Sequence, residues 1–447
     1  MSTRLTLHGT RQLAELGRRH GLSQEMIFDA QVVAQVLPFR TNDYVLRELI
    51  DWERVPDDPI FQLVFFVRDM LRPQHFSRIA DAIRSGAPQA RLDEIVRDIR
   101  LELNPDSSRQ STNVPRLGQT PVAGVQHKYA ETCLIMPSNG QTCFAYCTYC
   151  FRWPQFVALD EFHFATDEAA RFLEYIRRHR EITDVLLTGG DPLLMDARVL
   201  ARYVEPLLTP EFSHIQSIRI GTKALGFWPY RFLTDHDADD LLALFRRVVA
   251  SGRSLAFMAH FSHWRELTTD ACGRAVARIL ESGATIRTQA PLVRHVNDSA
   301  EVWSRMWREQ VRLGMYPYYM FIERDTGPNH YFQVPLIRAL DIYRGAMMHV
   351  SGLARTARGP VMSADPGKIS IDGIAYFGEE PVFVLSFLQA RNPDWVRRPF
   401  FARLDPSAAW ISGLQPAFGE RQFFFERAGQ QVPRRDGSRH DVPAGAI

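Results

Sequence analysis

Between about residues 130 and 350, short apolar runs alternate with longer segments whose apolar positions recur every three or four residues. The short runs predict strands at 184–188, 215–220, 255–259, 284–289 and 316–321. The longer segments predict helices at 167–179, 238–252 and 271–283, and the last two end in Ser-Gly, a common helix stop. Strands that start about 30 to 40 residues apart indicate repeated right-handed βα units and a parallel sheet. We therefore expect an α/β fold built on a partial (β/α) barrel, with a doubly wound open sheet as the alternative.

The pattern divides the chain into three parts. Residues 1–110 are predicted to be a helical N-terminal region, because apolar positions at 46–50 and 61–65 suit helices packed on one side. Residues 111–375 hold the barrel, which is preceded at 104–124 by a polar connection rich in Ser, Thr, Pro and Gly. The pattern weakens after about residue 375, so 376–447 is expected to be a C-terminal extension. Its aromatic residues could pack on the barrel, and its polar end at 430–447 is expected to be a mobile tail.

Composition narrows the class of protein. The 447 residues are 45% hydrophobic, and 53 Lys and Arg against 51 Asp and Glu leave a net charge of +2. Such a chain can bury a large core, and its charge favours neither nucleic acid nor anionic membranes as partners. No apolar run of about 18 residues predicts a membrane span, and the first 20 residues lack the apolar segment of a signal peptide. Five cysteines, three of them crowded together, favour the reducing cytoplasm over a disulfide framework.

The crowded cysteines form the pattern C-x3-C-x2-C, with Cys143, Cys147 and Cys150 in one short segment. Three thiolates from one loop can hold three corners of a cubane iron–sulfur cluster, and no nearby downstream cysteine closes the fourth corner. The fourth iron would then be open to a small molecule. Zinc is the main competitor, with His127 as the closest upstream residue to complete its ligands. Ordinary buried thiols are the third interpretation.

With Tyr149 as the aromatic residue before the last cysteine, the segment resembles the radical S-adenosylmethionine (radical SAM) enzymes. That resemblance implies that the open iron binds the methionine part of SAM, and that the reduced cluster cleaves SAM to a 5′-deoxyadenosyl radical. A second motif, Gly189-Gly190-Asp191, follows a predicted strand and resembles the family's GGE motif, which holds the methionine amino group. Paired glycines there let a ligand approach the backbone, and Asp191 can receive a cationic amine.

Further stretches are similar, in the same order, to the lysine 2,3-aminomutase group of radical SAM enzymes. They are residues 127–129, 187–194, 219–222, 260–263, 289–298 and 318–319. The resemblance implies an isomerase, an intramolecular aminotransferase that moves an amino group from Cα to Cβ of lysine or a related amino acid. It also implies that His260 and Gln289 lie near SAM. Arg152 matches an arginine that contacts carboxylates in the active site.

Members of this group also use pyridoxal 5′-phosphate (PLP), which is held by a lysine in a Gly-rich segment. Here Ala364-Asp-Pro-Gly-Lys368 is similar but shorter, which makes Lys368 the candidate Schiff-base lysine. The two phosphate-binding arginines of the group align with Lys128 and Thr132. One position therefore keeps a point charge and the other loses its charge, which predicts weaker affinity for PLP.

The group grips the distal amine of lysine with two aspartates, and this chain departs from that pattern. Arg324 stands at the first position and Asp325 is one step off. Asp365, Ser363 or Ala364 could take the second position, while Glu323 and Asp325 could equally be structural. An arginine there would repel a cationic side chain and favour an acidic or neutral one.

The expected partners are a small amino-acid substrate, an electron donor such as flavodoxin or ferredoxin, and further copies of the chain in a homo-oligomer. Nucleic acid and membranes are not expected. Two alternatives stay within the fold: a radical SAM enzyme with weakened or lost PLP use, and one that modifies a lysine of a partner protein. A non-catalytic redox sensor or electron carrier is the alternative from another class, and it leaves Gly189–Asp191 and Gln289 unexplained.

Overall fold

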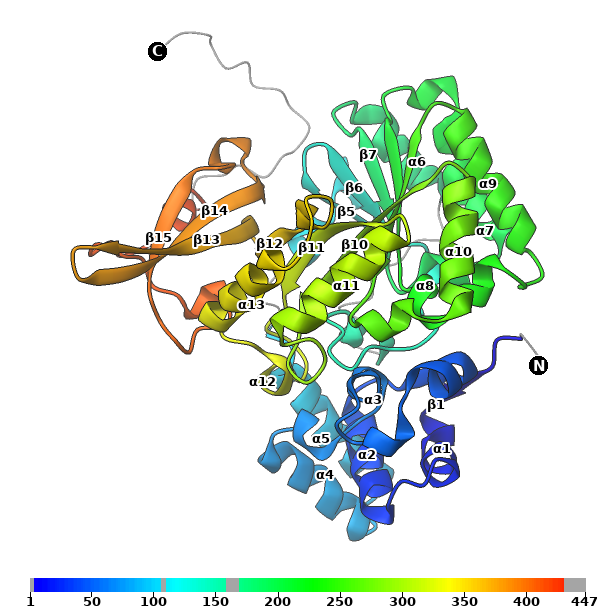
Figure 1. Ribbon diagram of the computed structural model, residues 1–447, viewed down its shortest axis with the longest axis vertical. Helices are drawn as coiled ribbons and strands as arrows, with labels where there is room; N and C mark the ends of the chain where they lie inside the picture. Colours follow the sequence, from blue (N-terminus) through cyan, green and yellow to red (C-terminus); the bar gives the residue numbers. More distant parts are fainter. Residues whose placement is uncertain (1–3, 106–109, 158–168, 430–447) are drawn as a thin grey trace.

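The centre of the molecule is one mixed sheet of eleven strands in sequential order from β5 to β15. A computed structural model of the protein (Figure 1) describes residues 4–105, 110–157 and 169–429. Seven neighbouring strands run parallel: β6 (Thr132–Ile135), β7 (Asp184–Leu187), β8 (Ser217–Thr222), β9 (Ser254–His260), β10 (Thr285–Leu292), β11 (Tyr316–Ile322) and β12 (Arg358–Ser363). A doubly wound sheet would reverse its strand order at one point, and this sheet does not. The sheet also stays open between its edge strands, so the expected partial barrel is confirmed.

Helices connect the parallel strands and cover the outside of the sheet (Figure 1). They are α6 (Ala169–Arg178), α7 (Ala197–Val204), α8 (Ala224–Phe227), α9 (Ala238–Ala250), α10 (Asp270–Glu281), α11 (Ala300–Arg312), α12 (Asn329–Phe332) and α13 (Leu336–Met348). Along β8 and β10, buried residues alternate with partly exposed ones, because one face packs under helices and the other lines the barrel. All five predicted strands and the helices α9 and α10 are confirmed, with ends that differ by at most three residues. The third predicted helix is α6, and its first two residues lie outside the described part.

The N-terminal region is helical and lies below the barrel in Figure 1. It contains α1 (Leu13–Arg19), α2 (Gln24–Val36), α3 (Pro59–Val64), α4 (Pro73–Arg84) and α5 (Gln89–Glu102), with a small antiparallel pair of β1 (Leu7–Gly9) and β2 (Arg40–Asn42). The apolar positions at 46–50 and 61–65 are buried, as their spacing predicts. The polar connection that follows includes the short strands β3 (Arg116–Leu117) and β4 (Thr120–Pro121).

Antiparallel strands extend the barrel sheet at both ends. β5 (Val125–Tyr129) pairs with β6 before the cysteine segment, while β13 (Gly367–Phe377), β14 (Glu380–Ala390) and β15 (Pro399–Arg403) follow β12. Regular structure thus continues past residue 375, and β13 runs through the expected boundary at 375–376. Trp395 and Phe400 pack on Phe387 of β14, at ring distances of 5.8 and 5.5 Å. The helix α14 (Phe424–Gly429) ends the described chain, and the expected mobile tail at 430–447 lies outside it. The three-part division of the chain remains a prediction.

The N-terminal region holds the segment that carries the three cysteines. The amide of Tyr146 donates to the carbonyl of Arg40 at 2.9 Å, and the amide of Thr148 donates to the carbonyl of Leu63 at 3.0 Å. Asn42, which is fully buried, donates from Nδ2 to the carbonyls of Phe144 and Phe227, both at 3.0 Å. Alternate residues of the cysteine segment are therefore fixed to strand β2 and helix α3. The N-terminal region thus helps to position the three cysteines.

We predict that Asn42→Ala lowers the free energy of unfolding by about 3 kcal/mol, because it leaves two carbonyls and the amide of Val45 without their buried partner. Denaturant unfolding measures the change. Asn392→Ala removes a half-buried asparagine that caps a short turn through the amide of Asp394, and it should cost about 1 kcal/mol. Equal losses in the two variants would contradict the role assigned to Asn42.

Candidate active site

The carboxyl ends of the parallel strands bring most of the predicted site residues to one rim of the barrel. The cysteine segment follows β6, Gly189–Asp191 follows β7, His260 ends β9 and Arg324 follows β11. This rim is where barrel enzymes place their catalytic groups, because the loops after parallel strands converge there. Because each of these residues follows or ends a parallel strand, residues about 180 positions apart in the chain, such as Cys143 and Arg324, lie in one region.

The thiols of Cys143, Cys147 and Cys150 are half-buried and free. Burial raises the pKa of all three, to about 12 for Cys147, so each is a neutral thiol until a metal displaces its proton. Among the described residues, the only set of three potential metal ligands that all lie within 4.8 Å of one another is Asp196, His236 and Asp237, so at least one pair of the three sulfurs is farther apart than this. Sulfurs around one zinc ion lie about 3.8 Å apart. The wider spacing suits a polynuclear cluster better than zinc.

His127, the residue considered as a fourth zinc ligand, is engaged elsewhere. Its Nδ1 lies 2.7 Å from the hydroxyl of Tyr175, and its Nε2 lies 3.0 Å from the carbonyl of Ala130. The Asp196, His236 and Asp237 group is also compromised as a metal site, because Arg231 binds the carboxylate of Asp237 at 2.6 and 3.0 Å.

Gly189 and Gly190 are packed directly against the start of the cysteine segment. A Cβ atom at Gly190 would lie 2.4 Å from the backbone nitrogen and oxygen of Thr142, and Gly189 has a φ of +129°. The amide of Asp191 donates to the carbonyl of Thr142 at 2.7 Å. We expected the glycines to admit a ligand, whereas in the described structure they admit the chain that precedes Cys143.

The carboxylate of Asp191 is a buried acceptor for several groups. It accepts hydrogen bonds from the amides of Leu193 and Lys223 at 3.1 and 2.9 Å, and from the hydroxyl of Thr222 at 2.8 Å. Burial raises its pKa to about 6, although these hydrogen bonds act in the opposite direction. The carboxylate thereby ties the end of β7 to the end of β8. Binding of an amine by Asp191 stays a prediction.

His260 and Gln289 are register partners on β9 and β10, so their side chains share one face of the sheet. Neither side chain has a hydrogen-bond partner within the described residues, which leaves both available to a ligand. Burial and the nearby ammonium of Lys223 lower the pKa of His260 to about 3, so its imidazole is neutral.

A buried hydrogen-bond network supports Tyr149 beside the cysteines. The Tyr149 hydroxyl lies 2.6 Å from the hydroxyl of Ser262, which in turn accepts from the Lys223 ammonium at 3.2 Å. Lys223 also pairs with Glu266 at 2.5 Å, and Glu266 accepts from the amides of Ser262 and His263. This network fixes Tyr149 in the interior. Ser262 and His263 lie in a stretch quoted for the family resemblance, but sequence reasoning gave them no role and missed Lys223 and Glu266.

Two arginines meet beside the last cysteine. The guanidinium groups of Arg152 and Arg324 lie 5.0 and 4.0 Å from the ring centre of Phe151, the residue after Cys150. Burial and Arg152 lower the pKa of Arg324 to about 10, which keeps its charge at neutral pH. Arg324 also donates to the hydroxyl of Ser363 at 3.3 Å. The structure thus brings Arg152 and Arg324 together in one basic corner.

Lys368 lies in β13 inside the barrel. Its ammonium donates to Gln389 at 2.5 Å and lies 4.7 and 5.6 Å from the ring centres of Tyr129 and Tyr319. Burial lowers the pKa of Lys368 to about 7, and the positive charges of Arg219 and Arg358 act in the same direction. About half of such a lysine is a neutral, nucleophilic amine at pH 7.

The two positions that match phosphate-binding arginines have different surroundings. Lys128 donates to the carbonyl of Ala364, and burial with Arg391 and Arg324 nearby lowers its pKa well below the usual value. Thr132 donates to Asp184 at 3.0 Å, and Asp184 is already bound by Arg219. Of the two positions, only Lys128 offers a cation.

The acidic residues near Arg324 do not converge on one point. Burial alone raises the pKa of Glu323 well above its usual value, and neither of its carboxylate oxygens has a hydrogen-bond partner within residues 4–105, 110–157 and 169–429. Glu323 also makes no ion pair within the described residues. Asp365 pairs with Arg391 at 2.5 Å.

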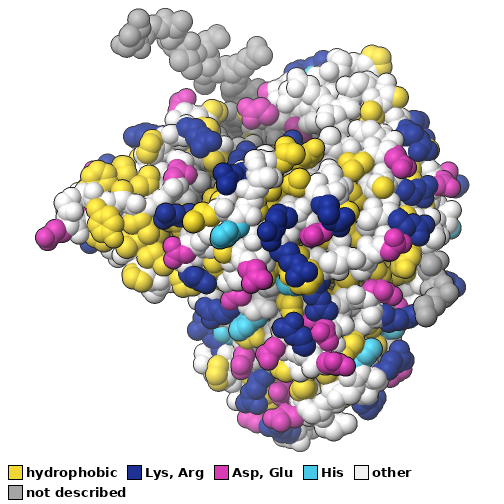
Figure 2. Space-filling view, in the orientation of Figure 1, with side chains coloured by type: hydrophobic (Ala, Val, Ile, Leu, Met, Phe, Trp, Pro, Cys, Tyr) yellow, Lys and Arg dark blue, Asp and Glu magenta, His cyan; other side chains and the backbone are white. Residues whose placement is uncertain are grey.

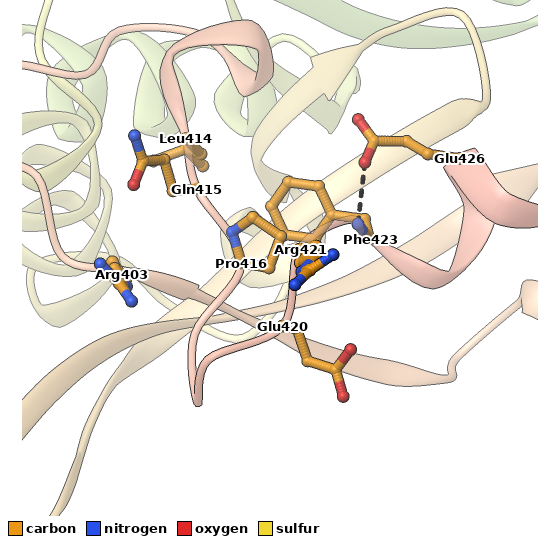
Figure 3. A pocket seen from close by; sticks show the side chains of 8 residues that line it. All are labelled: Arg403, Leu414, Gln415, Pro416, Glu420, Arg421, Phe423 and Glu426. Atoms are coloured by element: carbon orange, nitrogen blue, oxygen red, sulfur yellow. Dashed lines mark hydrogen bonds between the residues drawn. The ribbon is translucent and has the colours of Figure 1, made fainter.

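Two surface features lie away from this rim. A pocket on the C-terminal part is lined by Arg403, Leu414, Gln415, Pro416, Glu420, Arg421, Phe423 and Glu426 (Figure 3), and none of these is a predicted site residue. Apolar side chains gather on the projecting C-terminal strands at the left of Figure 2, where Tyr376, Phe377 and Phe418 are exposed. No helix in the part of the chain that the structure describes has the length and apolar character needed to cross a membrane.

A partial (β/α) barrel with three cysteines and a Gly-Gly-Asp turn at its carboxyl rim defines the radical SAM class of enzyme. Comparison with known proteins gives the family. The chain is 31% identical over 387 residues to an Aquifex aeolicus protein named "Putative L-lysine 2,3-aminomutase", covering 86% of this chain and 89% of that one. It is 25% identical over 315 residues to the L-lysine 2,3-aminomutase of Clostridium subterminale, covering 69% of each.

The comparison with solved structures gives a weaker likeness. A radical SAM methyltransferase from Sphaerobacter thermophilus has 13% identity and a TM-score of 0.34, over 65% of this chain and 93% of that one. No protein-family model matches the chain. On the strength of the Aquifex relative, the chain belongs to the lysine 2,3-aminomutase family of radical SAM enzymes, and it is an isomerase at that level of description. The family implies a 4Fe–4S cluster and SAM.

We predict that Gly190→Ala lowers both stability and iron binding, because its Cβ would overlap the backbone of Thr142. The expected loss in unfolding free energy is about 3 kcal/mol, and iron bound per chain after anaerobic reconstitution should fall severalfold. Gly373→Ala is the matched control, since no heavy atom lies within 4 Å of its added Cβ. If Gly190→Ala bound as much iron as the control, the packing of this turn would not be what holds the cysteine segment.

Proposed function

We propose that the protein is a PLP-dependent radical SAM 2,3-aminomutase acting on a free amino acid whose side chain is acidic or uncharged. Its family supports the radical SAM aminomutase chemistry. The use of PLP and the identity of the substrate are inferences from the residues of this chain. An electron donor such as flavodoxin or ferredoxin would reduce the cluster, and a cytoplasmic homo-oligomer is the expected form.

One observation carries the proposal: a short chain of contacts joins the cysteine segment to Lys368. Phe151 follows Cys150 and lies against Arg324, Arg324 donates to Ser363, and Ser363 is the register partner of Lys368. An aminomutase needs a radical source and a carbonyl cofactor on the same substrate, so both must be within reach of one small cavity. This connection supports such a shared site.

The residues at the rim supply the first half of that site. Cys143, Cys147 and Cys150 would hold the cluster, and their spread suits a group larger than one metal ion. SAM would bind next to the cluster, beside Tyr149 and the turn Gly189–Asp191. His260 and Gln289, on neighbouring strands, would offer it polar side chains that have no hydrogen-bond partner within the described residues. A neutral His260 can donate or accept one hydrogen bond without adding charge beside a sulfonium.

Lys368 and the basic corner supply the second half. With a pKa of about 7, Lys368 offers a neutral, nucleophilic amine at neutral pH and would be the residue that holds PLP. Arg152 would bind the substrate carboxylate, since a buried guanidinium matches a carboxylate in geometry and charge. Arg152 would thereby fix the carboxylate end of the substrate.

When bound, SAM and PLP supply a carbon radical and an electron-delocalising ring, which are the chemistry that amino-acid side chains lack. The net reaction exchanges a hydrogen and an amino group between Cα and Cβ, so it consumes no oxidant or reductant. The chain's own contribution is to orient the substrate, exclude water with buried aromatic residues, and hold the amine of Lys368 neutral.

Arg324 sets the proposed substrate preference. It lies in the basic corner with Arg152, whereas Glu323 makes no ion pair within the described residues and Asp365 is paired with Arg391. A cationic side chain would be repelled there by the guanidinium groups of Arg324 and Arg152, and a carboxylate would be attracted by them. A radical SAM enzyme with lost PLP use is the second candidate, favoured by the uncharged Thr132 at a phosphate position.

The test is anaerobic incubation of the reduced, reconstituted protein with SAM, PLP and glutamate, aspartate, alanine or lysine. Mass spectrometry should find a β-amino isomer of an acidic or neutral substrate and little from lysine. The variant Arg324→Gln should lower kcat/KM for an acidic substrate by at least about tenfold. Lysine as the best substrate would overturn the substrate assignment, and isomers formed without PLP would overturn the cofactor assignment.

We predict that borohydride reduction after incubation with PLP leaves a pyridoxyl group on Lys368, and that Lys368→Arg abolishes it. Because the neutral amine is the reactive form and the folded pKa is about 7, the rate of adduct formation should rise with pH and level off just above 7. An ordinary lysine would keep rising towards about 10.4. Peptide mapping by mass spectrometry across pH 5.5–9.5 measures this. A rate that continues to climb at pH 9 would contradict a depressed pKa.

A further inference from the structure

Several cations surround Lys368. Arg219 and Arg358 are the charged groups that act most strongly on it, and Arg324 acts less strongly. Lys128 is in turn influenced by Arg391, Arg324 and Lys368. A phosphorylated cofactor that reacts with Lys368 must place its phosphate near one of these cations.

Arg219 is already neutralised. Its guanidinium binds both oxygens of Asp184, one of them at 2.8 Å, and Asp184 also accepts from Ser217 and Thr132. The position that lost an arginine, Thr132, is thus part of a satisfied network around Asp184. Thr132 is uncharged and the charge of Arg219 is paired with Asp184, so neither side chain would bind an anion strongly.

Arg358 differs from Arg219 in having no acidic partner. It is the first residue of β12, is half-buried, and lies 4.3 Å from the ring centres of both Tyr318 and Tyr319. Within the described residues its guanidinium makes no ion pair and no hydrogen bond. The ammonium of Lys368 lies 5.6 Å from the ring centre of the same Tyr319, so Arg358 and Lys368 share this aromatic neighbour.

A half-buried guanidinium that lies against two aromatic rings still has its five N–H donors available to a ligand. Its planar fork matches two oxygens of a phosphate, and its charge persists at any relevant pH. Lys128 is less suited, because its ammonium already donates to the carbonyl of Ala364 and is crowded by two arginines.

We propose that Arg358 binds the phosphate of PLP, replacing from β12 the cation that the chain lacks at Thr132. This inference rests on the proposed use of PLP. It assigns the phosphate to Arg358, and it leaves Arg152 and Arg324 for the substrate.

The experiment compares PLP with pyridoxal, which has the same aldehyde and no phosphate. Each is titrated into the full-length protein, and the pyridoxyl adduct on Lys368 is quantified after borohydride reduction. We expect Arg358→Gln to lower the affinity for PLP at least about tenfold and to leave the affinity for pyridoxal unchanged. The PLP affinity of Arg358→Lys should lie between those of Arg358→Gln and the unaltered protein. Lys128→Gln should change PLP affinity less than Arg358→Gln does.

Arg287→Gln is the matched control. Arg287 is a half-buried arginine on β10 that lies 5.4 Å from the ring centre of Tyr316, and it is not among the charges that act on Lys368. The control should bind PLP like the unaltered protein. If Arg358→Gln bound PLP as tightly as the unaltered protein, or lost affinity for PLP and pyridoxal equally, Arg358 would not be the phosphate ligand. The proposed use of PLP would not be affected by that result. If the unaltered protein formed no adduct with either aldehyde, PLP use itself would fall, and the assignment with it.

Discussion

The backbone of Thr142 is where three parts of the chain meet, and the site depends on that contact. Gly190 leaves no room for a side chain there, the amide of Asp191 donates to the Thr142 carbonyl, and Arg40 of the N-terminal region donates to the Thr142 hydroxyl. Because Cys143 is the next residue, this junction fixes where the cysteine segment begins. Asn42 and Leu63 then hold its middle. A segment of three thiols is thereby positioned by packing and backbone hydrogen bonds before any metal binds.

The second constraint is an excess of positive charge inside the barrel. Arg152, Arg324, Lys128, Lys368 and Arg358 are buried or half-buried, whereas Asp184 and Asp365 are each paired with another arginine. An excess of buried positive charge is costly, so such a cavity is suited to anions. A phosphate and the carboxylates of an amino acid would supply the missing negative charge. Burial, aided by this excess of charge, brings the pKa of Lys368 to about 7, where its amine can react.

The parallel strands and their helices could be predicted from sequence, because each strand is short and apolar and each helix is amphipathic. The three cysteines could also be placed together, since their spacing is local. The strands after residue 375 were harder to predict, because β14 buries residues on both faces and shows no alternation. Asn42 and Arg358 were missed because their partners lie on other elements, and a single polar residue has no periodic pattern. The glycine pair was recognised, but the sequence could not show that the cysteine segment itself would fill the space beside it.

The central claim is that the three thiols held at this junction bind a cluster with one iron open to SAM. Electron paramagnetic resonance of the anaerobically reconstituted, reduced protein tests it most directly. The account predicts about four iron atoms per chain and a cluster spectrum that changes when SAM is added. Absence of iron, or a spectrum that SAM leaves unaltered, would contradict it.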